Sequence, residues 1–102
     1  EELSELALYL LANPQISAEI IVHTDTKGSE EENMKLSQNR SKYLAVRLAQ
    51  QGIDASRLVA IGKGESEPII DCPNENSCTE AEHQKNRRVQ IILKNDKKTA
   101  EN

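Results

Sequence analysis

The sequence predicts a layered α/β or α+β fold, in which helices pack on one mixed sheet. Leucines near the amino terminus recur at three- and four-residue spacing, as in an amphipathic helix. A β-branched run at residues 20–22 is followed at once by turn residues, as at the end of a buried strand. Residues 86–93 alternate in polarity like a strand. Strands and helices that alternate in this way are typical of layers around one sheet.

The first predicted helix precedes Pro14, which ends it. Its apolar residues have the spacing of a core-facing stripe and are Leu3, Leu6, Ala7, Leu10 and Leu11. A strand over residues 17–24 follows, so Asp25 lies at its carboxyl end. After a turn at residues 26–28, Ser29 can cap a long helix that ends near Gly52, a residue able to adopt the left-handed conformation.

One face of this long helix changes character along its length. Periodicity places on it Asn33, Ser37, Arg40, Leu44 and Leu48, with Leu36 and Tyr43 at its flank. The later half is ordinary core. The first half, here called the polar half-face, offers Asn33, Ser37 and Arg40. A buried Arg40 needs a partner, and Asp25 is the candidate. A structural Asp25–Arg40 ion pair and a ligand site are both consistent with this spacing.

The remaining elements are shorter. Residues 52–56 are a connector, strand character returns at 57–61, and residues 62–85 form a long loop in which 79–84 can be a capped helix. In the last strand, alternation places Arg87, Val89, Ile91 and Leu93 on the core-facing side. We therefore expect one domain over residues 1–94 and a polar tail over 95–102.

Composition excludes several classes of protein. The 102 residues suffice for one domain with a modest core. A net charge of −4 without Trp or Phe argues against nucleic acid as a partner. No apolar run approaches the ~20 residues that a membrane span needs. The missing initiator Met leads us to expect a piece of a longer protein.

Two chemical alternatives deserve weighing. Ser37, His23 and Asp25 are the residue types of a hydrolytic triad, but Ser37 lies within a helix without a nucleophile-elbow pattern, so we expect no enzyme. A zinc site would use Cys72, Cys78 and His83, but structural zinc requires four ligands at tighter spacing. No metal or organic cofactor is expected.

Several motifs together resemble one family. They are His23-Thr-Asp-x-x-Gly28, Asn33-x-x-Leu-Ser-x-x-Arg40, Gly52-Ile-Asp-Ala-Ser-Arg-Leu58, Gly62-x-Gly-Glu-x-x-Pro68 and Asn86-Arg-Arg-Val89. In this order they resemble the OmpA-like peptidoglycan-binding domain of outer-membrane porins, the peptidoglycan-associated lipoprotein and flagellar stator proteins. The run from Cys72 to Arg88 is similar to the version common in Bacteroidetes bacteria. Family members begin with another strand before the first helix, and this strand is absent here, so we expect either that it was cut off or that another segment supplies it.

The resemblance implies a noncatalytic module of the periplasm, attached to the outer membrane through a parent protein. It would bind the diaminopimelate residue of the peptidoglycan stem peptide, with Asp25 on the ligand's ammonium group and Arg40 on its carboxylate. Thr24, Asn33, Leu36 and Arg87 match other positions that line the family pocket. The alternative is a structural or protein-docking domain that does not bind peptidoglycan. In the oxidising envelope, Cys72 and Cys78 should form a disulfide that orders the long loop.

Overall fold

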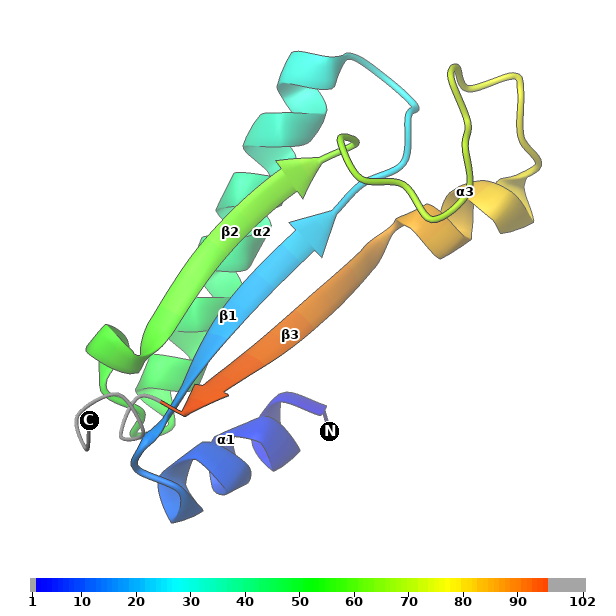
Figure 1. Cartoon of the computed structure of the whole chain (residues 1–102). Coiled ribbons are helices and arrows are strands. Elements are labelled where there is room, and N and C mark those ends of the chain that lie inside the picture. Colours follow the sequence, from blue (N-terminus) through cyan, green and yellow to red (C-terminus); the bar gives the residue numbers. More distant parts are fainter. Residues whose placement is uncertain (1, 96–102) are drawn as a thin grey trace.

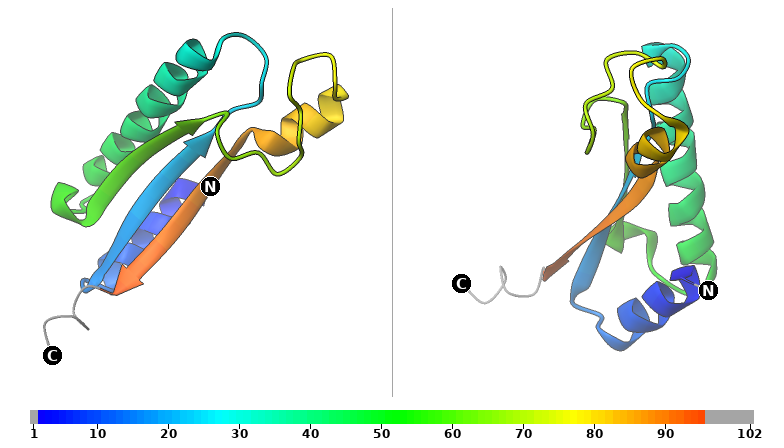
Figure 2. Two further views of the ribbon diagram at one scale, coloured as in Figure 1. Left: turned by 45° about the horizontal axis from the view of Figure 1, so that its top comes forward. Right: turned by 90° about the vertical axis from the view of Figure 1, so that its right-hand side faces the viewer.

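Two helices cover one face of a three-stranded mixed sheet in the computed structural model, which describes residues 2–95 (Figures 1 and 2). The helices are α1 (Glu2–Ala12) and α2 (Glu30–Gln50), and the strands are β1 (Ile16–His23), β2 (Leu58–Gly64) and β3 (Arg88–Asn95). A short helix, α3 (Glu80–Asn86), and a 3-10 turn, η1 (Ala55–Arg57), complete the elements. The predicted fold class is confirmed.

The strand directions bring three strand ends together at one end of the sheet. This end is called the site edge. The order is β2-β1-β3, with β1 parallel to β2 and antiparallel to β3. The carboxyl ends of β1 and β2 therefore lie beside the amino end of β3, and His23 pairs with both Gly64 and Arg88. The loops that leave these ends can place their polar side chains together.

The helix boundaries follow local chemistry. Ser29 accepts a hydrogen bond from the Glu32 amide and caps α2, whose first turn carries three glutamates at the positive end of the helix dipole. The α1 helix ends before Pro14, where the Arg57 guanidinium donates hydrogen bonds to the carbonyls of Leu10, Asn13 and Ile16. Arg57 thus satisfies carbonyls that the end of α1 leaves free.

The core lies between β1, α1, the later half of α2 and the connector. Its buried apolar residues are Ala7, Leu10, Ile16, Ala18, Ile20, Leu48 and Ile53. Leu11, which the periodicity assigned to the core face, is 48% exposed.

The first half of α2 packs directly on the backbone of β2. A Cβ atom at Gly62 would lie 2.3 Å from the Gln38 amide nitrogen, so only glycine permits this approach. Two residues further on, the Gly64 amide donates a hydrogen bond of 2.8 Å to the Ser37 hydroxyl. The helix start is therefore fixed to the strand end that adjoins the site.

The prediction that the apolar row of β3 packs into the core was wrong about its burial. Val89, Ile91 and Leu93 do face the helix layer, but they are 53%, 37% and 45% exposed. The two helices leave between them a groove of about 450 Å³, which these side chains line together with Leu3 and Leu6 of α1. Within residues 2–95, β3 is also an edge strand.

The end of the chain and its membrane character complete the description. Asn95 is the last residue of β3, and the rest of the predicted polar tail lies outside the described residues. None of the helices in residues 2–95 combines the length and apolarity required to cross a membrane.

Candidate functional site

The loop of residues 65–79 lies at the site edge of the sheet and is held there by a disulfide and by hydrogen bonds to a side chain of α3. Cys72 and Cys78 form a disulfide, which confirms the predicted pairing. The buried Asn86 side chain accepts hydrogen bonds from the Ile69 and Ile70 amides and donates one to the Ile70 carbonyl. These fastenings order a loop that lacks regular structure.

Helix α3 connects this loop to β3. Thr79 and Glu82 form the expected capping box at its start. The buried His83 ring pairs with the Glu75 carbonyl through Nε2 and so fixes the helix under the loop. Because α3 ends at Asn86 and β3 begins at Arg88, Arg87 is the one residue between them and lies at the site edge. Glu80, the first residue of α3, reaches it with its side chain.

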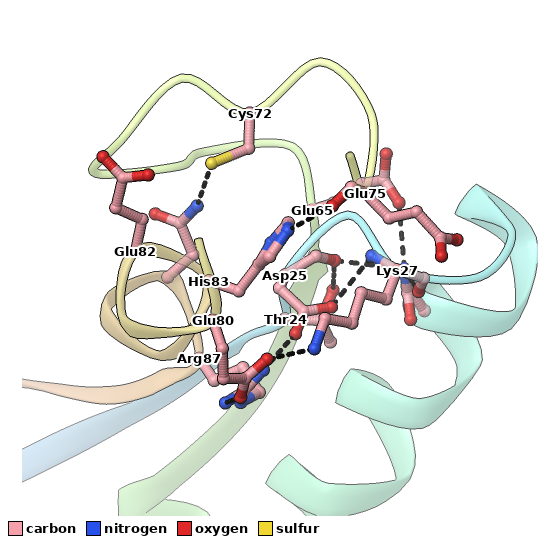
Figure 3. A network of polar contacts seen from close by, with 12 residues as sticks. Thr24, Asp25, Lys27, Glu65, Cys72, Glu75, Glu80, Glu82, His83 and Arg87 are labelled. Atoms are coloured by element: carbon pink, nitrogen blue, oxygen red, sulfur yellow. Dashed lines mark hydrogen bonds and ion pairs between the residues drawn. The ribbon is translucent and has the colours of Figure 1, made fainter. Parts of the chain in front are cut away.

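A charge cluster formed by Asp25, Lys27, Glu80 and Arg87 occupies this edge (Figure 3). The Arg87 guanidinium bridges two carboxylates, since Nη1 binds Asp25 and Nη2 lies 2.6 Å from Glu80 Oε2. The other carboxylate oxygen of Glu80 binds the Lys27 ammonium. Asp25 accepts a further hydrogen bond, of 2.9 Å, from the Lys27 backbone amide.

The cluster perturbs the protonation of its members. Hydrogen bonds from Lys27 and then Arg87 lower the pKa of Glu80 from 4.5 to about 2. The carboxylates of Glu80 and Asp25 in turn raise the pKa of Arg87. Both pKa shifts favour the charged forms of Glu80 and Arg87.

Arg87 also lines a cavity of about 480 Å³ between the first part of β3 and α2. Arg40, Tyr43 and Leu44 line it from α2, and Arg88 lines it from β3. Within residues 2–95, no hydrogen bond or ion pair engages the Arg40 guanidinium. The cavity thus offers one unpaired guanidinium opposite a second one that is held by the charge cluster.

Of the two alternatives for Asp25 and Arg40, the structural ion pair with a buried Arg40 is not formed in the described part of the chain. Arg40 is exposed on α2, and the residue buried beside it is Ser41, which is 1% exposed. The partner of the buried Asp25 is Arg87. Helical periodicity placed Arg40 one position away from the buried face, and the backbone at Ser37 and Gln38 is the part of α2 that packs against Gly62 of β2.

Asn33 and Ser37, the other two residues of the polar half-face, use their side chains for hydrogen bonds within the fold. The Asn33 amide nitrogen donates to the carbonyls of Asp25 and Lys27 and to Glu65 Oε1. Ser37 accepts from the Gly64 amide and donates to the Met34 carbonyl. These residues position the loop after β1 and the end of β2.

Two further predicted site residues differ in exposure. Thr24 is buried, and its hydroxyl donates to the Asp25 carbonyl. Leu36 is 41% exposed on α2.

Sequence reasoning missed Lys27 and Glu80. The signal available for Glu80 was its place at the first position of a helix with a predictable cap, two residues after a cysteine.

The alternative chemistries find no support in this arrangement. Both Ser37 bonds are structural, and His23 Nε2 lies 3.1 Å from Gln90 Oε1. Both cysteines are in the disulfide, so zinc lacks its thiolates. In the described part of the chain, no group of three or more His, Cys, Asp or Glu residues could hold a metal ion.

Fold and site together define a class of protein: an α/β domain that presents fixed charges beside an open cavity, suited to binding. The model of the OmpA family matches residues 1–87. The chain therefore belongs to the OmpA family, and the resemblance inferred from the motifs is confirmed. The proteins of this family that it matches are structural or binding proteins, so the domain is noncatalytic.

Individual relatives agree with this assignment. The chain is 40% identical over 91 residues to the probable lipoprotein YiaD of Escherichia coli K12, with 89% of this chain and 39% of the relative covered. It is 33% identical over 93 residues to the peptidoglycan-binding protein ArfA of Mycobacterium tuberculosis, with 91% of this chain and 27% of the relative covered. The chain thus spans less than half the length of these relatives.

A solved structure shows the same fold. The peptidoglycan-associated lipoprotein from Burkholderia pseudomallei superimposes with a TM-score of 0.79 at 27% identity, and 90% of this chain and 74% of that one are covered.

Proposed function

We propose that this domain binds peptidoglycan without catalysis, through the diaminopimelate residue of the stem peptide. By this contact it anchors a longer envelope protein to the cell wall, in the periplasm and at the outer membrane. The observation that carries the proposal is the cavity between Arg40 and Arg87, because it joins an unpaired guanidinium to the charge cluster around Asp25.

Arg40 and Arg87 line the cavity, and the Asp25 carboxylate lies next to it on Arg87, so these charges together suit the head group of a zwitterionic amino acid. Arg40 binds the ligand carboxylate, since a planar guanidinium can donate two parallel hydrogen bonds to it. Asp25 accepts from the ligand ammonium while it keeps its bond to the Lys27 amide. Arg87 is paired with Asp25 and lines the cavity together with Arg40, so the same ligand carboxylate contacts both guanidinium groups.

The other predicted site residues serve this arrangement differently. Thr24 and Asn33 position Asp25 through their hydrogen bonds to its carbonyl. Leu36 offers an exposed apolar contact beside them. Binding to the wall is consistent with relatives named for peptidoglycan association and with lipoproteins among the matches.

Substitution of Arg40 tests the proposal. A hydrogen bond to a charged group is worth about 1.5–3 kcal/mol, so Arg40→Ala should weaken binding of a soluble diaminopimelate muropeptide by roughly one to two decades. Arg40→Lys should also bind poorly, because an ammonium group cannot make the two-point contact. Isothermal titration gives the affinities, and thermal melting should show both variants folded because none of the residues that the structure describes pairs with the Arg40 guanidinium.

The matched control is Lys35→Ala, which removes one exposed positive charge from the same helix. It should bind like the parent. If Arg40→Ala also binds muropeptide and sacculi like the parent, the proposed site is wrong. If the parent itself binds neither, a structural or protein-docking role takes its place.

A further inference from the structure

Glu80 is ion-paired with Arg87, and Arg87 is the cation that a ligand carboxylate would reach from the cavity. Arg87 is the one residue that belongs both to the charge cluster and to the cavity lining. Of its two carboxylate partners, Asp25 has a side chain that is 8% exposed, whereas that of Glu80 is 62% exposed. The two contacts of Arg87 therefore differ in how easily they can be exchanged.

The Asp25 contact is difficult to replace. A carboxylate that loses its partner while buried carries an uncompensated desolvation cost. Asp25 is also fixed by the Lys27 amide and by the loop that Asn33 holds. An incoming anion gains nothing by separating this pair.

The Glu80 contact is easy to replace. Ion pairs at the surface contribute little because water solvates the separated charges well. Glu80 extends from the first turn of α3, so its side chain can swing into solvent without moving the helix backbone. Figure 3 shows its carboxylate reaching across to both Arg87 and Lys27.

We propose that Glu80 is an internal competitor of the ligand: its carboxylate holds Arg87 in the empty site and is displaced by a carboxylate of the bound molecule. The inference rests on the proposed function, since it concerns the selectivity of the same cavity. A ligand without a carboxylate at this point cannot displace Glu80 and gains no affinity when Glu80 is neutralised. Glu80 therefore selects for ligands that carry the acidic group.

The test compares two probes and two variants. The probes are soluble muropeptides with diaminopimelate or with lysine at the same stem position; lysine keeps the ammonium group and lacks the side-chain carboxylate. The variants are Glu80→Gln and, as matched control, Glu82→Gln. The control removes the same charge from the same helix, and glutamine still completes a capping box.

Loss of an exposed ion pair from the competing state should tighten Glu80→Gln binding of the diaminopimelate probe by roughly two- to fivefold. Its affinity for the lysine probe, and both affinities of Glu82→Gln, should equal those of the parent. Unchanged or weaker binding of the diaminopimelate probe by a folded Glu80→Gln variant overturns the inference while the proposed function stands. If neither parent nor Glu80→Gln binds either probe, the proposed function fails and the inference fails with it.

Discussion

Two polar regions adjoin the same strand ends but are built on different principles. Asn33 and Ser37 on α2 are buried, uncharged and hydrogen-bonded to the backbone of neighbouring elements. The charge cluster is ionic, and two of its members, Lys27 and Glu80, are 44% and 62% exposed. The first region holds elements together. The second leaves groups that can change partners. Polar residues near a strand end thus indicate a ligand site only where they can exchange their present partners for groups of a ligand.

The largest expected effect concerns the close contact between Gly62 of β2 and the backbone of α2, next to the buried polar residues. Gly62→Ala would force a methyl group against the α2 backbone at Gln38, which cannot move away as a flexible side chain could. We expect a loss of about 3 kcal/mol in the free energy of unfolding. Urea denaturation measures it, with the 46%-exposed Val59, as Val59→Thr, for a control on the same strand. A loss below about 1 kcal/mol would show that α2 is not fixed at Gly62.

A smaller loss should follow from Ser37→Ala. It leaves the buried Gly64 amide without an acceptor, which costs about 1–3 kcal/mol. The control is Ser41→Ala, because the Ser41 hydroxyl bonds only within its own helix, to the Gln38 carbonyl, and its loss should cost less than about 1 kcal/mol. Ser37→Ala should bind muropeptide normally once folded. Weakened binding at full folding would place Ser37 in the ligand site instead.

The smallest effect on stability should come from the charge cluster. Lys27→Gln removes the main cause of the lowered pKa of Glu80, which should rise from about 2 toward 4.5 while Arg87 keeps it below that value. Carboxyl carbon NMR during an acid titration measures the shift. Lys63→Gln, from the exposed pair with Glu67, should leave the pKa of Glu80 unchanged.

The same variant tests the pH dependence of stability. A carboxylate whose folded pKa is lowered stabilises the fold above its ordinary pKa of 4.5, and this contribution is lost as the pH falls toward about 2. Lys27→Gln should therefore flatten the acid limb of the melting-temperature profile between these values: its melting temperature should be slightly lower than the parent's at pH 7 and should equal it near pH 2. An unchanged limb would mean that the Lys27–Glu80 pair contributes nothing in solution.

Much of the fold could be predicted because its signals are local. Helical spacing, the Ser29 and Thr79 caps and the turn residues determined where α2 and α3 begin, since each depends on neighbours within a few positions. The row of Val89, Ile91 and Leu93 shows the limit of such reasoning. Alternation indicates which side of a strand is apolar, and it says nothing about whether helices cover that side fully.

The candidate site shows the same division. The sequence by itself determined that Asp25 follows a buried strand, that polar residues begin α2 and that Arg87 heads the apolar row of the last strand. Only the tertiary structure decided which arginine Asp25 binds, because Arg40 and Arg87 both suit a carboxylate and differ in where their elements lie. The antiparallel pairing of β3 with β1 brings Arg87 to Asp25, whereas Arg40 lines the cavity from α2. An ion pair between residues 62 positions apart depends on packing that no local pattern encodes.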